Sequence, residues 1–375
     1  MTSAVGGRAR TPRTTTVSSG RALGLYDLEN DAAEKNDLME SDPERGKAVL
    51  DRFKAFRRSL REVKVRVKKT DAVPGSLEGA RILVTGAAGF LGRHLCRRLG
   101  ADGASVVGVS RSPLFDAPPA GVSTWLQADL GLESECARVM GEASPDVIYQ
   151  LAGAVSGSRA RSLVKPTFLA NVASTVYLME LAVDRTASFI QLGSLEEPTE
   201  VNEIAVSPYG ASKTAATTYL KLYARLYELK AVIARVFMAY GPGEQDENKL
   251  LPHVVRTLLR GEDPKLSSGK RGVDWVYVDD VTEGLVRVAE RAGALAGQRV
   301  DIGSGELVEV REVVERVYRL MSPGRTPVLG TLPDRADEAT RRADMVATRR
   351  QLDWVPEVPL DEGLARMIEW FRANP

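Results

Sequence analysis

The segment Arg81–Leu95, RILVTGAAGFLGRHL, places a glycine-rich turn between an apolar strand pattern and an amphipathic helix pattern. Gly86, Gly89 and Gly92 recur in it at three-residue spacing. Glycines there permit a tight turn and let the backbone approach phosphate oxygens, while the amides of the helix N-terminus point at the negative charge. The segment therefore predicts a dinucleotide-binding turn.

Strand and helix patterns continue to alternate after this turn. The apolar strand patterns are RILVTG, ASVVGVS, PDVIYQLA, ASFIQLGS and AVIARVF, and helical patterns cover 89–103, 163–184 and 209–228. Near-continuous apolar strands alternating with helices indicate a parallel sheet covered on both faces. We expect an α/β fold: a Rossmann-type doubly wound parallel sheet, mainly within 79–235, with a smaller C-terminal substrate-binding region, mainly within 236–375.

Residues 1–78 differ from the remainder and are expected to form an N-terminal extension. Residues 1–20 are rich in Ser, Thr, Gly and Arg, a composition typical of disorder. Pro43–Lys69 has apolar residues at alternating spacings of four and three, which predicts a helix, and carries eleven basic and three acidic residues. This helix could dock on a partner or on the acidic remainder of the chain, or present a solvated basic face. Residues 72–79 resemble a linker.

Composition excludes several classes of function. The net charge of +1 gives no general attraction to nucleic acid, and no run of about 18 apolar residues predicts a membrane span. Cys96 and Cys136 cannot form a disulfide framework, which fits a reducing, cytoplasmic location. With only two histidines and no Cys/His pair at ligand spacing, no metal site is predicted.

The stretch SPYGASK sets Tyr209 four residues before Lys213. On a helix these side chains share one face, so the ammonium would lie near the phenol. A nearby positive charge favours phenolate and lowers the pKa of a tyrosine. The pair is therefore a candidate acid–base unit, although an isolated pair of this kind is more often a surface feature.

The second strand pattern ends in Ser110 and Arg111 rather than in a carboxylate. An acidic residue here would bind the adenosine ribose hydroxyls and repel a 2′-phosphate, whereas arginine pairs bidentately with phosphate. We therefore expect NADP(H) to be preferred, with NAD(H) possible.

From about Gly79 to Pro375 the chain resembles an extended short-chain dehydrogenase/reductase of the branch that modifies nucleotide sugars. In order along the chain, the elements that carry the resemblance are TGAAGFLG, ADL, QLAGAVS, GS, YGASK, RVFMAYGPG, VDWVYVDDV and LDWVPEVPLDEGL. The resemblance implies that Ser194, Tyr209 and Lys213 are catalytic and that Tyr209 and Lys213 also contact the cofactor. It further implies cofactor contacts from Gly86, Gly89, Phe90, Leu91, Ser110, Arg111, Asp129, Leu130, Leu151, Ala152 and Gly153.

The stretch GSLEEPTE favours one reaction among those of this branch. In related 4,6-dehydratases, the hydroxyl residue at the position of Ser194 is followed by an acidic or hydroxyl residue and then by a glutamate. Here the three residues are Ser194, Leu195 and Glu196. Leucine cannot exchange a proton, and the sequence looks more like that of deoxysugar ketoreductases. The resemblance thus predicts an NADPH-dependent ketoreductase acting on a nucleotide-linked 4-keto-6-deoxyhexose. An NAD-recycling 4-epimerase is the alternative, followed by a dehydratase and by a non-catalytic nucleotide-binding partner protein.

Two departures from the family pattern affect the predicted substrate contacts. Met238 stands where many relatives have an asparagine that touches the substrate diphosphate, and Val273 stands where an arginine is usual. Arg271 lies on the same side of an extended segment as that position. The substrate-binding candidates are Ser156, Ser194, Glu196, Lys249, Arg271 and Arg335. Family members commonly dimerise through two helix pairs, so a homodimer is expected, built here from the helices near 164–181 and after Tyr209.

Overall fold

The computed structural model describes residues 42–44, 47, 48, 51, 76–113, 117–200, 202–244, 246–334 and 340–374. The chain divides into two compact units, Met1–Lys69 and Thr70–Pro375. In the first, residues 43, 44, 47, 48 and 51 are helical, as the sequence predicts there. The remainder of the predicted basic helix and the N-terminal tail lie outside the described residues.

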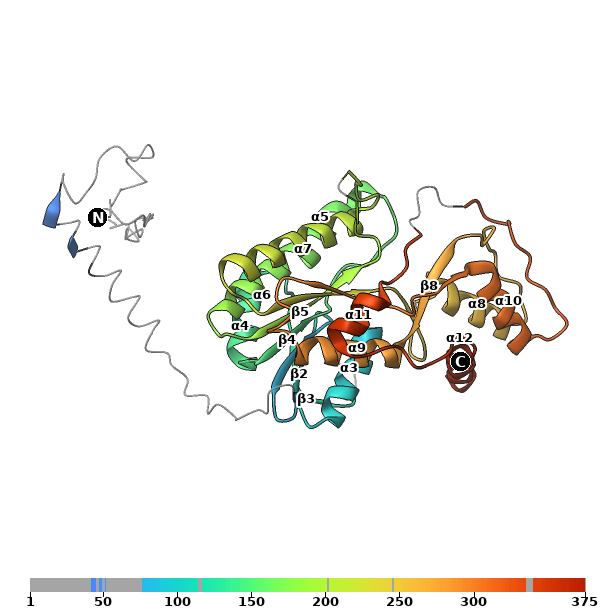
Figure 1. Ribbon diagram of the computed structural model, residues 1–375, viewed down its shortest axis with the longest axis horizontal. Helices are drawn as coiled ribbons and strands as arrows, with labels where there is room; N and C mark the ends of the chain where they lie inside the picture. Colours follow the sequence, from blue (N-terminus) through green and yellow to red (C-terminus); the bar gives the residue numbers. More distant parts are fainter. Residues whose placement is uncertain are drawn as a thin grey trace, which may run out of the picture. The chain divides into compact units, whose positions relative to one another are not determined.

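Seven parallel strands form the central sheet of the second unit (Figure 1). Their order is β3-β2-β1-β4-β5-β6-β9, and every neighbouring pair is parallel. The bounds are β1 Arg81–Thr85, β2 Ser105–Ser110, β3 Val122–Gln127, β4 Val147–Gln150, β5 Ser188–Ser194, β6 Ala231–Val236 and β9 Arg299–Ile302. The predicted doubly wound parallel sheet is confirmed.

Helices cover both faces of this sheet and bury alternate strand residues. On one face lie α3 (Phe90–Ala101) and α9 (Val278–Glu290), packed on Ile82, Tyr149 and Val232. On the other lie α4 (Glu133–Ala143), α6 (Ser174–Val183) and α7 (Pro208–Leu226), packed on Leu83, Ile148 and Phe189. Figure 1 shows the two helix layers on opposite sides of the strands.

The C-terminal part adds a small sheet of order β10-β8-β7. It comprises β7 (Met238–Tyr240), β8 (Gly272–Tyr277) and β10 (Leu307–Glu309), with β7 parallel and β10 antiparallel to β8. Helices α8 (Leu250–Leu259), α10 (Val310–Met321) and α12 (Leu360–Ala373) share its apolar core. The short helix α11 (Met345–Leu352) instead contributes Leu352 to the core of the main sheet.

Three details differ from the sequence expectations. Strand β3 has no fully buried side chain, since three are partly buried and three exposed, and it lacks the continuous apolar pattern of the inner strands. The predicted helix 163–184 is continuous but irregular, with η1 (Arg161–Leu163), α5 (Val164–Thr167) and a π-helical turn η2 (Phe168–Ala173) before α6. Leu77, inside the expected linker, is 7% exposed and packs in the core.

Among the described residues, the stretch Arg161–Val183 is long and apolar enough to cross a membrane by length and composition. Half of its most apolar window is buried inside the fold, and core helices of globular proteins pass the same test. In this structure the stretch forms the helices that flank the sheet.

Candidate active site

A cavity of about 1550 Å³ opens at the carboxyl ends of the parallel strands and extends to the C-terminal part. Ligands of open α/β sheets bind at this edge. Every predicted cofactor residue except Lys213 lines the cavity, as do the substrate candidates Ser156, Ser194, Glu196, Lys249 and Arg271. Arg335 lies outside the described residues.

The glycine turn between β1 and α3 forms one wall of the cavity. Gly86 has a φ of +68°, and a Cβ there would lie 2.9 Å from the backbone nitrogen of Ala152. A side chain is therefore excluded by both backbone strain and the neighbouring loop. The turn keeps bare backbone at the start of α3, which is what a dinucleotide pyrophosphate requires.

Ser194 ends β5 and Tyr209 lies in the first turn of α7, so the β5–α7 connection brings their hydroxyls together. Ser207 caps α7 by accepting a hydrogen bond from the amide of Gly210 at 2.9 Å. The Ser194 hydroxyl is hydrogen-bonded to the phenol of Tyr209. It also accepts the amide of Glu196 at 3.1 Å. Both residues line the cavity.

Lys213 lies one turn after Tyr209 and is 5% exposed. Its Nζ is 5.9 Å from the centre of the Tyr209 ring and donates to the carbonyl oxygen of Leu192 at 2.8 Å. Burial lowers the pKa of Lys213 to about 8, and the charge of Glu197 opposes this decrease. The ammonium therefore begins to lose its proton within the range of ordinary assays.

The pKa of Tyr209 moves opposite to the sequence prediction. Burial raises it to about 12, and this effect outweighs the hydrogen bond from Ser194, which lowers it. Desolvation disfavours the phenolate in this structure, and the charges of Glu196 and Glu197 act in the same direction. At neutral pH Tyr209 is a phenol, the form needed by a proton donor.

The candidate substrate residues differ in how they are held. Glu196 Oε2 accepts a hydrogen bond from the capping Ser207 at 2.6 Å, so its carboxylate supports the start of α7. Lys249 forms an ion pair with the buried Glu244 at 2.8 Å, so part of its charge is offset. Arg271 is partly buried at the cavity wall.

Several residues at the site were not identified from sequence. Thr85 Oγ1 accepts the amides of Leu151 and Ala152 at 3.1 and 3.0 Å and thereby fixes the loop beside the glycine turn. Asn171, in the π-helical turn, accepts the amide of Ala154 and donates to Ser212 on α7. Both are buried polar residues on apolar elements, which is the signal that could have marked them.

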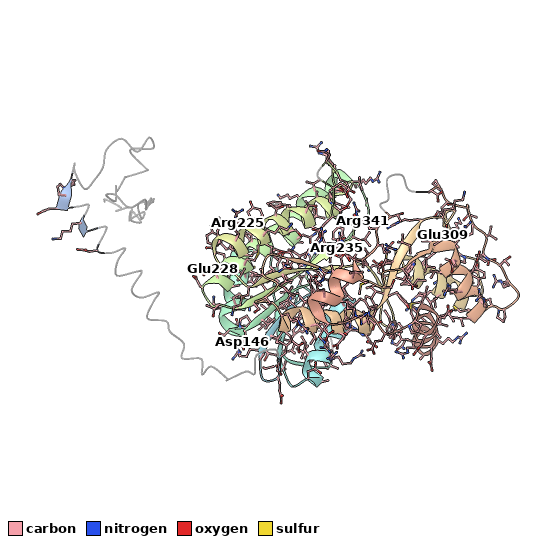
Figure 2. The ribbon with its side chains drawn as sticks, viewed as in Figure 1. Asp146, Arg225, Glu228, Arg235, Glu309 and Arg341 are labelled. Carbon is pink, nitrogen blue, oxygen red and sulfur yellow. The ribbon has the colours of Figure 1, made fainter. Side chains whose placement is uncertain are left out.

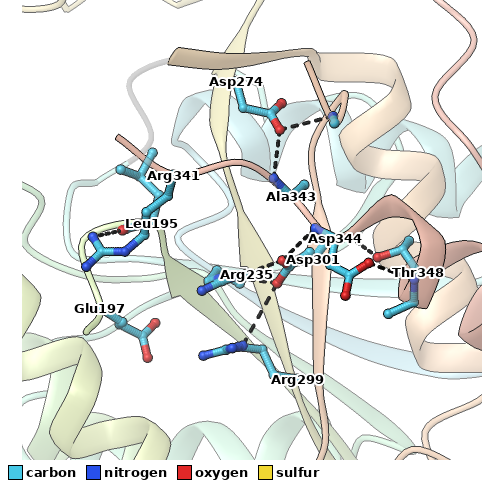
Figure 3. A network of polar contacts seen from close by, with 12 residues as sticks. Leu195, Glu197, Arg235, Asp274, Arg299, Asp301, Arg341, Ala343, Asp344 and Thr348 are labelled. Atoms are coloured by element: carbon cyan, nitrogen blue, oxygen red, sulfur yellow. Dashed lines mark hydrogen bonds and ion pairs between the residues drawn. The ribbon is translucent and has the colours of Figure 1, made fainter. Parts of the chain in front are cut away.

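A polar network joins the main sheet to the chain that returns from the C-terminal part (Figure 3). Arg235 and Asp301, on adjacent strands and at most 7% exposed, form a two-point ion pair at 2.8 and 2.5 Å. Asp301 also accepts the amide of Asp344 at 3.0 Å. Arg341 donates to the carbonyl oxygen of Leu195 at 2.8 Å and pairs with Glu203, which ties this returning segment to the connection between β5 and α7. Arg235 and Arg341 both lie where the sheet meets the C-terminal part (Figure 2).

This arrangement of glycine turn, hydroxyl pair and buried lysine agrees with comparisons to known proteins. Residues 82–303 match the model of the NAD dependent epimerase/dehydratase family. The chain belongs to this family. Its members are extended short-chain dehydrogenases/reductases, and the present chain is an enzyme of that type.

Relatives in the family carry out different reactions. The chain is 32% identical over 316 residues to a UDP-glucose 4-epimerase of Mycolicibacterium smegmatis, covering 78% of this chain and 98% of the relative. It is also 32% identical to UDP-glucuronic acid decarboxylase 6 of Arabidopsis thaliana, over 78% and 89% of the two chains. A solved epimerase of Methanothermobacter thermautotrophicus superposes with a TM-score of 0.69 at 26% identity, over 80% and 94%. Similarity thus establishes the family, and the reaction has to be inferred from the residues of the site.

Proposed function

We propose that the protein is an NADPH-dependent ketoreductase acting on a nucleotide-linked 4-keto-6-deoxyhexose. The observation that carries this proposal is the residue between Ser194 and Glu196: Leu195 lines the cavity with a side chain that cannot exchange a proton. Glu196 is held by the cap of α7. Loss of water would need an acid and a base at the sugar, whereas carbonyl reduction needs only one proton donor.

The chain's own groups suffice for the proton part of this reaction. The reduced nicotinamide, when bound, supplies the hydride to the sugar carbonyl carbon. The Ser194 hydroxyl and the Tyr209 phenol polarise the carbonyl oxygen, and Tyr209 then donates its proton to that oxygen as negative charge develops. Lys213 contributes positive charge beside the phenol, which stabilises the phenolate left behind.

Incubation with a panel of nucleotide-linked 4-ketosugars tests the proposal directly. Consumption of NADPH, followed at the absorbance of the reduced cofactor, is expected with at least one 4-keto-6-deoxyhexose. Product analysis by mass spectrometry is expected to show a gain of two hydrogens. NADPH oxidation with none of the ketosugars would contradict the assignment.

A variant of Arg111 tests the proposed preference for NADP(H). Ser110 and Arg111 line the cavity at the end of β2, where a 2′-phosphate would lie. Arg111→Ala removes a bidentate, charge-assisted phosphate partner, so we expect NADPH to bind about 10-fold more weakly and NADH affinity to change little. Fluorescence titration of each reduced cofactor measures this ratio. Equal losses of affinity for NADPH and NADH would show that Arg111 does not recognise the 2′-phosphate.

A 4-epimerase is the second candidate, because the relative at 32% identity is a UDP-glucose 4-epimerase. An epimerase of this type would be isolated with bound NAD and would interconvert two nucleotide sugars without added reductant. The same panel, run with saturated sugars and no NADPH, separates the two reactions.

We also propose that the protein is a homodimer that works in the cytoplasm. Apolar side chains stand exposed on the helices named for the dimer: Val164, Phe168 and Leu169 before α6, and Tyr219, Leu222 and Leu226 on α7. Such exposed apolar side chains are favourable in a helix-to-helix interface. Light scattering in solution would measure the mass against the 40.7 kDa of one chain.

A further inference from the structure

Glu197 is a buried carboxylate that the proposed reaction does not use. It is 3% exposed and lies in the turn after β5. Its Oε1 accepts the amide of Ser194 at 2.6 Å, and its Oε2 accepts the hydroxyl of Thr217 at 2.7 Å. A Cβ on Gly193 would lie only 2.8 Å from Oε1, so the strand leaves room for this oxygen. Since an isolated buried charge is costly, a nearby positive charge is expected.

Lys213, 5% exposed on α7, is a buried cation whose charge interacts with that of Glu197. Lys213 and Thr217 are four residues apart on α7 and therefore share one helix face. Thr217 thus holds the Glu197 carboxylate on the lysine side of the helix. The only hydrogen bond of Lys213 within the described residues goes to an uncharged carbonyl, that of Leu192. The charge of Glu197 raises the pKa of Lys213 against the effect of burial.

The other charged and titratable groups around this pair are engaged elsewhere. Tyr209 contacts Ser194 with its hydroxyl, and Glu196 supports the helix cap through Ser207. On the neighbouring strand β6, Arg235 is paired with Asp301. Among the described residues, Glu197 is therefore the carboxylate whose charge acts on the buried ammonium.

We propose that Glu197 is a positioning residue: it fixes the backbone of Ser194 and, held by Thr217, offsets the charge of the buried Lys213 ammonium. After burial and the charge of Glu196, its negative charge also disfavours the phenolate of Tyr209, so it favours the protonated form of both partners. This is the state from which a ketone is reduced. The proposal rests on the proposed function only in assigning Lys213 to the cofactor side of the site.

The test is the pH dependence of NADPH binding, measured by fluorescence titration of the full-length protein from pH 6 to 10 without sugar. Glu197→Gln keeps an acceptor for Ser194 and the size of the side chain but removes the charge. The wild-type affinity is expected to decline above pH 8 as Lys213 loses its proton. In the variant this decline should begin at lower pH, so that binding at pH 8 is several-fold weaker than in the wild type. Glu200→Gln, an exposed glutamate of the same segment, is the matched control and should follow the wild type.

A Glu197→Gln profile that superimposes on the wild type would overturn the proposal, even if the variant unfolds at lower temperature. Glu197→Asp keeps the charge but shortens the side chain by one methylene. The pH profile of NADPH binding should therefore shift in the same direction as in Glu197→Gln, by a smaller amount. If the glutamine variant does not fold, an unshifted aspartate profile overturns the proposal equally. Because no sugar is used, failure of the ketosugar panel would reject the ketoreductase assignment and leave this result standing.

Discussion

Replacing Tyr209 with phenylalanine is expected to lower kcat for ketosugar reduction by roughly 10²–10⁴-fold, because a positioned general acid contributes about that factor. The variant loses only the hydroxyl that touches Ser194 and retains the ring beside Lys213. NADPH affinity should therefore remain within a few-fold of the wild type. Steady-state kinetics with the best ketosugar of the panel, together with fluorescence titration of NADPH, measure both quantities.

Tyr227→Phe is the matched control for that substitution. Tyr227 follows the same helix α7, is half exposed and lies outside the cavity, so removal of its hydroxyl should leave kcat unchanged. If Tyr209→Phe retained wild-type kcat, proton donation by the phenol would be excluded. Loss of NADPH binding in the same variant would instead mean that the hydroxyl organises the cofactor site.

Arg235→Met is expected to reduce the free energy of unfolding by about 3–5 kcal/mol, because it removes the two-point partner of a buried carboxylate and leaves that carboxylate only the 3.9 Å contact with Arg299. Arg235 and Asp301 are 5% and 6% exposed and share two hydrogen bonds. Asp301 in addition receives the amide of Asp344. Urea unfolding followed by circular dichroism measures the change.

The double variant Arg235→Met/Asp301→Asn removes both charges and retains an acceptor for the Asp344 amide. It should recover most of the stability lost in Arg235→Met, since an uncharged pair leaves no buried charge unpaired. A double variant less stable than Arg235→Met alone would contradict the idea that the buried charge of Asp301, without Arg235, causes the loss of stability.

The sheet and the proximity of Tyr209 and Lys213 could be predicted because their signals are local. A glycine turn after an apolar strand, and a tyrosine four residues before a lysine, specify their own geometry. Glu196 and Glu197 show the limit of this approach: both follow the same strand, yet only Glu197 is buried against α7. Which of two adjacent residues in a turn points inward depends on the backbone path, and residue spacing does not reveal it.

The charge state of Tyr209 could not be predicted for a similar reason. The sequence places an ammonium nearby but does not give the extent of burial, and burial is the larger effect on the pKa of this phenol. Likewise, Lys249 is a plausible phosphate ligand by position, while its pairing with Glu244 becomes visible only in the folded loop.

The segment that leads from the C-terminal part back to the main sheet limits which pieces can be exchanged between family members. Asp274 receives the amides of Ser304, Gly305 and Ala343, and Asp301 receives that of Asp344. A tail grafted from a relative must therefore supply amide donors at these two points, or each of the two inward-facing carboxylates will lose one of its hydrogen-bond donors. Recombination that seeks a new sugar preference should keep β8, β9 and the segment before α11 from one parent.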